Sequence, residues 1–145
     1  MYMSFIDVMV FIKKQMQSYL NDEFKSLNLK SSEMILLQIL YKEKSKSQIE
    51  LSRIIECDKA HIHRIVFKLI DKNLIEYSKE NELSKNSKLI LTDSGHDVAS
   101  KIDKSLKLWY SKLLKGISKE NLNITHNVIK QMLHNAEQFK KGEIN

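Results

Sequence analysis

Between residues 47 and 75, apolar and polar positions follow the pattern of two short helices, a tight turn between them, and an apolar strand after them. In the second predicted helix, apolar residues recur at i, i+3, i+4 and i+7 and form a stripe of Ile62, Ile65, Val66 and Leu69. The opposite face carries Ala60, His63, Arg64, Phe67 and Lys68. The pattern therefore predicts a helix with a buried back and a front that carries hydrogen-bond donors.

Polar residues mark the ends of these two helices. Ser47 and Glu50 have the spacing of a capping box, in which each side chain accepts a hydrogen bond from the other residue's backbone N–H. Asp58 stands where it can cap the second helix and complement its dipole. Asn73 follows that helix, and asparagine tolerates the left-handed conformation that often ends one.

Longer helical patterns precede this segment. Residues 4–25 form an amphipathic helix whose apolar side is Phe5, Val8, Met9, Ile12, Met16, Tyr19 and Leu20. The next helix, which we expect Ser31 or Ser32 to cap, is apolar almost all round: Met34, Ile35, Leu36, Leu37, Ile39 and Leu40. Such a helix is expected at the centre of the core.

The second half of the chain begins with two strand patterns, residues 74–77 and 88–92, around a polar loop of residues 78–87. Thr92 then caps a helix with the stripe Val98, Ile102, Leu106, Trp109 and Leu113. After Gly116 and a Ser118 cap, a last helix carries Leu122, Val128, Ile129, Met132, Leu133, Ala136 and Phe139. The predicted fold is mainly α-helical with a small β-hairpin wing.

Composition narrows the classes of function. The chain has 145 residues, a net charge of +6, no proline and a single cysteine, Cys57. The positive charge weakly favours a polyanion such as nucleic acid. We expect no membrane span, no signal peptide and a reducing cytoplasmic location. With no glycine-rich phosphate loop, motif-anchored catalytic triad or metal-spaced acidic cluster, we expect neither an enzyme nor a bound metal or cofactor.

The order of three helices, a two-stranded wing and a further helix is that of a winged helix-turn-helix. Four segments together, residues 47–52, 58–64, 69–75 and 91–95, resemble the MarR family of transcriptional regulators, and the resemblance covers nearly the whole chain. The chain departs from the family's pattern at Leu83 and Lys85 in the wing, where Asp and Arg are common. It departs again at Asn73, which is commonly glycine, and at Phe67, which is commonly polar.

The resemblance implies one MarR-like domain over residues 1–145, with a DNA-binding lobe over about 31–92 and dimerisation helices over about 1–28 and 96–145. It also implies an obligate homodimer that binds a pseudo-palindromic operator. The apolar stripes of the terminal helices exceed what a roughly 50-residue module must cover, which favours a dimer over a monomeric bundle. The expected dimerisation residues are Phe5, Val8, Met9, Ile12, Trp109, Leu113, Ile129, Met132, Leu133 and Phe139.

The expected DNA contacts come from the start of the first helix of the central segment, from its second helix and from the wing. They are Ser47, Lys59, Ala60, His61, His63, Arg64, Lys68, Lys85 and Lys88. Arg64 can pair with a guanine edge or clamp a phosphate; the alternative is a solvated arginine or one bonded to an acidic neighbour. Phe67 can touch a thymine methyl, but packing on the wing or first helix is the favoured interpretation. Cys57 is either a redox-sensitive thiol or a small core residue.

The resemblance implies a sequence-specific repressor that binds double-stranded DNA and that a small aromatic or phenolic ligand releases. The expected ligand cleft is lined by Met9, Ile12, Met16, Leu36 and Leu40. The alternatives are a helical scaffold protein that binds other proteins and a non-specific, nucleoid-type DNA binder.

Overall fold

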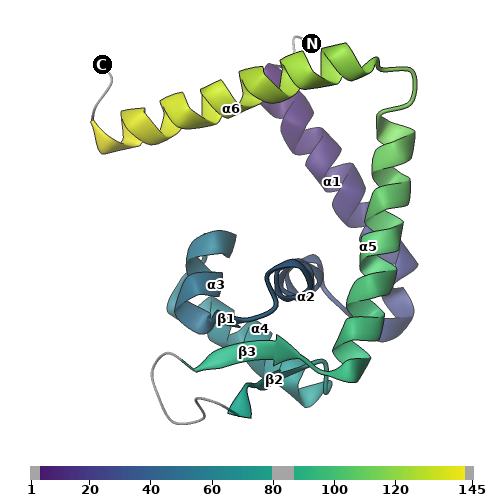
Figure 1. Cartoon of the computed structure of the whole chain (residues 1–145), viewed down its shortest axis with the longest axis vertical. Helices are drawn as coiled ribbons and strands as arrows, with labels where there is room; N and C mark the ends of the chain where they lie inside the picture. The colour runs from purple at the N-terminus through teal and green to yellow at the C-terminus, as the bar shows by residue number, and fades with distance from the viewer. Residues whose placement is uncertain (1–3, 80–86, 143–145) are drawn as a thin grey trace. The chain divides into compact units, whose positions relative to one another are not determined.

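The computed structural model describes residues 4–79 and 87–142, and the chain divides into two compact units, Met1–Trp109 and Tyr110–Asn145. In chain order the elements of the first unit are α1 (Phe5–Glu23), the short 3-10 helix η1 (Lys25–Leu27), α2 (Ser31–Glu43), β1 (Lys46–Ser47), α3 (Gln48–Ile55), α4 (Lys59–Asp71), β2 (Ile75–Tyr77), β3 (Lys88–Leu91) and most of α5 (Asp93–Leu113) (Figure 1). The second unit holds the end of α5 and α6 (Lys119–Lys141). No described helix combines the length and the apolar character that a membrane span requires.

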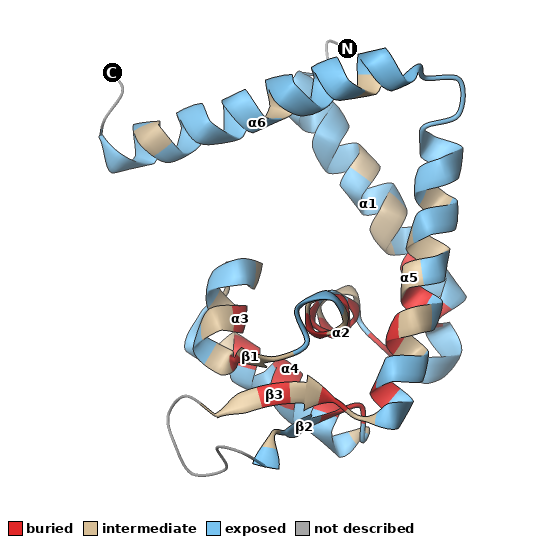
Figure 2. Ribbon diagram, viewed as in Figure 1, coloured by how far each residue is buried: buried red, intermediate tan, exposed pale blue. Residues whose placement is uncertain are grey.

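The core of the first unit is built around α2 and α4, whose inward faces are red in Figure 2. The apolar pattern of α2 is confirmed: Met34, Leu36, Leu37 and Leu40 are almost completely buried. The inward stripe of α4 is confirmed as well, since Ile62, Ile65, Val66 and Leu69 are all buried. Each such side chain stabilises the fold by about 1.5–3 kcal/mol relative to an exposed position.

The wing is an antiparallel hairpin of β2 and β3, as the sequence predicted, with Ile75 opposite Leu91 and Tyr77 opposite Leu89. A third strand, β1, was missed. It pairs antiparallel with β3, so the strand order is β1-β3-β2 and Lys46 lies opposite Leu89. The sequence did not predict β1 because a strand of two residues shows no periodic pattern of apolar positions. Its pairing also joins segments about forty positions apart in the chain.

The predicted helix caps are confirmed at four of five places. Ser47, Asp58, Thr92 and Ser118 each accept a hydrogen bond from a backbone N–H three residues later, at 2.7–3.2 Å. The prediction for α2 was wrong, because Ser31 is already helical and Lys30 is the cap residue. The Glu33 carboxylate accepts a hydrogen bond from the Lys30 N–H at 3.2 Å. This bond satisfies one of the backbone donors at the start of α2.

The first half of α5 is held against the rest of the first unit by a close backbone contact and by a side-chain hydrogen bond. A Cβ atom on Gly95 would lie 1.8 Å from the Leu74 carbonyl oxygen, so this position admits glycine alone without a backbone shift. Gln38 of α2 donates through Nε2 to the Ala99 carbonyl at 2.8 Å. Val98, Ala99, Ile102 and Leu106 contribute to the core from this helix.

The second unit contains no buried residue on α6 among those described. The helix begins at the Ser118 cap and ends at Gly142, whose φ of 74° is the left-handed conformation that favours glycine. Its apolar residues Ile124, Val128, Leu133 and Phe139 are at least half exposed in the isolated chain. The apolar side of α6 is therefore uncovered in the isolated chain.

Candidate nucleic-acid interface

Helix α4 holds the residues that the sequence singled out for DNA contact. Its 13 residues begin after Asp58, whose Oδ1 accepts from the His61 N–H at 2.7 Å. The buried stripe described above fixes the rotation of the helix about its axis. Lys59, Ala60, His63, Arg64, Phe67 and Lys68 are consequently all exposed. The predicted division into a buried back and a free front is therefore confirmed.

Phe67 differs from the favoured interpretation. It was expected to pack on the wing or the first helix, yet its exposed fraction is 66%. The neighbouring Val66 is 2% exposed, so the core is filled by the residue beside it. That expectation was wrong because helical geometry places residue 67 on the same side as His63 and Arg64, away from the core.

Arg64 contacts a residue of its own helix. Its Nη2 lies 3.4 Å from Nδ1 of His61, one turn earlier. The alternative of an acidic partner finds no such bond among the described residues. His61 is half-buried, in keeping with its expected place on the side of the helix. The contact steadies the guanidinium at the exposed face while leaving its other donors available, because arginine carries five N–H groups.

The wing base is tied to the start of α3 by Glu50. Its carboxylate accepts from the Ser47 N–H at 2.7 Å and from Lys88 Nζ at 2.6 Å. These bonds, above all the one from Lys88, lower the pKa of Glu50 to about 2. The structure thus places Lys88 in an ion pair and Ser47 in a buried cap, with its N–H engaged. Both were expected to contact phosphate, and both have a structural partner in the free protein.

A second tie fixes the end of α4. The Lys72 ammonium donates to the Asn28 carbonyl and lies 3.4 Å from the buried carboxylate of Glu33. Asn73 then takes the left-handed conformation predicted for it, with φ 55°. Its carbonyl accepts from Thr92 Oγ1 at 2.7 Å, which links the end of α4 to the start of α5.

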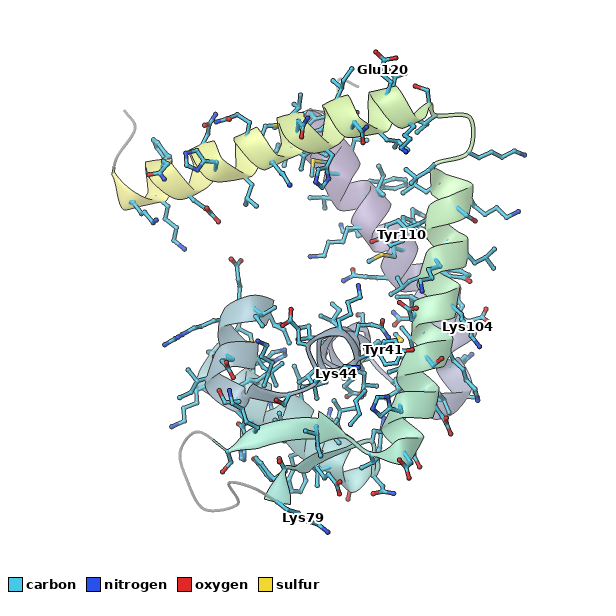
Figure 3. The ribbon with its side chains drawn as sticks, viewed as in Figure 1. Tyr41, Lys44, Lys79, Lys104, Tyr110 and Glu120 are labelled. Carbon is cyan, nitrogen blue, oxygen red and sulfur yellow. The ribbon has the colours of Figure 1, made fainter. Side chains whose placement is uncertain are left out.

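One further link was not predicted from the sequence. Gln48 Nε2, on the first residue of α3, donates to the Tyr77 hydroxyl on β2 at 2.7 Å. The 29 positions between these residues left no local signal for this pair. Lys79 follows β2 and extends away from the sheet into solvent (Figure 3). The predicted contact residue Lys85, like Leu83, lies outside the described residues.

The structure also places the candidate residues for a redox site, a metal site and a ligand cleft. Cys57 is half-buried against the core. Within residues 4–79 and 87–142, no three His, Cys, Asp or Glu side chains lie close enough to share a metal ion. Of the residues expected to line a ligand cleft, Leu36 and Leu40 are core residues, Met16 packs against that core, Ile12 is half-buried and Met9 is exposed.

The residues expected at a dimer interface are largely uncovered in the isolated chain. On α1, Phe5, Val8 and Met9 are exposed, and Ile6, Val10 and Phe11, which the sequence analysis did not select, are exposed beside them. Leu113 is exposed at the end of α5, while Ile12, Trp109 and Ile129 are half-buried. Met132, Leu133 and Phe139 are exposed on α6.

Comparison with known proteins finds a family model that matches the central part of the chain. The MarR family model matches residues 29–82, which span α2, α3, α4 and the first strand of the wing. No curated protein matches the chain in sequence.

Solved structures match over the whole chain. A SlyA-like transcription regulator from Listeria monocytogenes has a TM-score of 0.81 and 25% identity over 100% of this chain and 99% of its own. A putative MarR family transcriptional regulator from the same organism, crystallised with a 26mer DNA, gives the same values. A MarR transcriptional regulator from Methanosarcina mazei Go1 has a TM-score of 0.77 and 19% identity over 91% of this chain and 88% of its own. Residues 29–82 therefore match the MarR family, and the whole chain has the winged helix-turn-helix fold of solved MarR-family transcriptional regulators.

Proposed function

We propose that this chain is a sequence-specific DNA-binding regulator that places α4 in the major groove. The observation that carries the proposal is the exposed face of α4, where Lys59, His63, Arg64 and Lys68 offer donors to base edges and phosphates. The similarity to a Listeria regulator that was crystallised with DNA supports it. An enzymatic role has no support in the fold or in the family.

The proposed active form is a homodimer. Two identical subunits would present two copies of α4 to half-sites about 34–36 Å apart on a pseudo-palindrome. The exposed apolar residues of α1 and of α6 support this assembly, because monomeric proteins rarely leave faces of this kind uncovered. Sedimentation equilibrium should give twice the chain mass, and a monomer at micromolar concentration would contradict the dimer.

The proposed output is repression in the cytoplasm, with release from DNA by a small aromatic or phenolic ligand. A ligand can act only by favouring a dimer geometry whose α4 spacing no longer fits the half-sites. The proposed site lies beside Met9, Ile12 and Met16, where α1 changes from exposed to packed against the core. Leu36 and Leu40 would form its floor only if α1 moved, because both are fully buried here.

Binding titrations against a selected duplex and random duplexes, repeated at several salt concentrations, test the proposal. The affinity of a regulator for DNA should fall steeply as the salt concentration rises. It should also bind its selected site about a thousandfold or more tightly than random duplexes. Salt-dependent binding with equal affinity for the selected and the random duplexes would point to a nucleoid-type binder. No binding to any duplex would favour a protein scaffold.

Replacing Arg64 by alanine tests the assigned face. Loss of a bidentate base contact should weaken binding to the selected site by roughly 1–3 kcal/mol and relax the preference at one base pair. Lys104→Ala is the matched control, since it also removes one exposed positive charge but lies on α5 (Figure 3). Equal effects of the two substitutions would show that Arg64 contributes only net charge.

A further inference from the structure

One aromatic ring stands among the charged residues on the exposed face of α4. Phe67 is the ninth residue of the helix, and 66% of its surface is exposed between Arg64 and Lys68. Phenylalanine is among the residues most often buried, and the core beneath is already filled by Val66 and Leu69. The core of this unit is therefore filled without the Phe67 ring.

The surroundings of the ring indicate the chemistry of what covers it. Lys59, Arg64 and Lys68 share the same exposed face, and the described residues show no ion pair for any of them. A partner for this face must carry negative charge and must also offer an apolar group at one point. In the major groove of duplex DNA, the C5-methyl of thymine is the apolar group on the base edges.

The spacing along the helix sets where that methyl group lies. Phe67 lies three positions after Arg64, which corresponds to about 4.5 Å along the axis of an α-helix. Successive bases of one strand are about 3.4 Å apart, so the two side chains reach neighbouring base pairs. Arginine pairs preferentially with guanine through O6 and N7, and an apolar side chain fits the thymine methyl.

We propose that Phe67 is a specificity-determining residue that contacts a thymine methyl, one or two base pairs from the guanine bound by Arg64. The inference rests on the proposed function and deepens it by naming a base that each half-site must contain. It differs from a general stacking or packing role, because it depends on one methyl group of the DNA.

Removing that methyl group from the DNA tests the inference directly. The probe is a duplex that the wild-type protein selects from a random-sequence pool, resynthesised with deoxyuridine in place of each thymine in turn. Uracil keeps every hydrogen-bonding group of thymine and lacks only the methyl. Burial of one methyl corresponds to about fourfold in affinity, so one position per half-site should show about this loss. Substitution in both half-sites should cost roughly fifteenfold.

Two variants complete the experiment. Phe67→Ala should bind the thymine and uracil duplexes equally, whereas Phe67→Leu, which keeps an apolar side chain, should still prefer thymine. Because residue 67 is exposed, both variants should unfold at the temperature of the wild-type protein, and this is measured alongside.

The outcomes separate this inference from the function on which it rests. If the wild-type protein selects no duplex, the proposed function and the inference both fail. Selective binding that is unaffected by uracil at every thymine would overturn the inference alone. The same holds if Phe67→Ala discriminates between thymine and uracil as well as the wild type does, in which case the ring meets a protein surface instead.

Discussion

The partly buried ion pair between α2 and the end of α4 allows a quantitative test of how α4 is held. The Glu33 side chain is 3% exposed, and Lys72 Nζ, on a side chain 28% exposed, lies 3.4 Å from it. Lys72→Met keeps most of the side-chain length and removes the charge. The Glu33 carboxylate then retains the Lys30 N–H as its described partner and loses its cation.

Removing one partner of a fully buried pair costs about 3–5 kcal/mol. The ammonium of Lys72 is partly in contact with water, which reduces the expected cost to about 2 kcal/mol. Glu33→Gln keeps an acceptor for the Lys30 N–H, and Lys72 still donates to the Asn28 carbonyl, so we expect a loss of about 1 kcal/mol.

The double variant removes both charges and should be less destabilised than the sum of the single variants, by roughly 1 kcal/mol. Urea unfolding at a fixed protein concentration measures all four free energies, which keeps any contribution of assembly constant. Most surface substitutions change the free energy of unfolding by less than about 0.5 kcal/mol. If Lys72→Met changes it by no more than this, the ion pair does not hold α4 in place. Additive single effects would refute the coupling.

Substitutions at three further positions test the surrounding framework. Gly95→Ala would place a Cβ 1.8 Å from the Leu74 carbonyl oxygen, so we expect a loss of about 3 kcal/mol or more in urea unfolding; an unchanged midpoint would contradict the close approach. Glu50 has a folded-state pKa of about 2, below its ordinary value of 4.5, because Lys88 and the helix cap stabilise its charged form. Its contribution should be complete above about pH 4.5 and disappear as the pH falls towards 2, and thermal melts of Glu50→Gln over this range should show a weaker pH dependence than the wild type. Asp58→Ala removes the cap of α4 and should cost about 1 kcal/mol, whereas Asp58→Asn, which also caps well, should cost little; equal losses would show that charge and not capping matters.

Local sequence signals were sufficient for most of the fold. The caps at Ser47 and Asp58 and the stripe from Ile62 to Leu69 depend on residues within one or two turns of each other, and all are confirmed. The same holds for the left-handed Asn73. These features follow from helical periodicity and from backbone donors that need a nearby acceptor.

The features that the sequence did not predict join distant segments. Strand β1 exists because Lys46 and Ser47 pair with β3, which lies about forty positions later in the chain. The bond from Gln48 to Tyr77 likewise joins two segments that are distant in the sequence. At the candidate site, the face of α4 could be predicted, but the engagement of Lys88 by Glu50 could not. Phe67 was placed on the correct face and then assigned to packing, because the frequency with which phenylalanine is buried outweighed the geometry.

In the proposed function, the exposed face of α4 is the surface that meets DNA. Amide chemical-shift mapping by NMR, with the isotope-labelled protein and its selected duplex, tests it most directly. The largest changes should fall on His63, Arg64 and Phe67 and on the residues next to them along α4. Changes confined to α6, or none on α4 at saturating duplex, would contradict it.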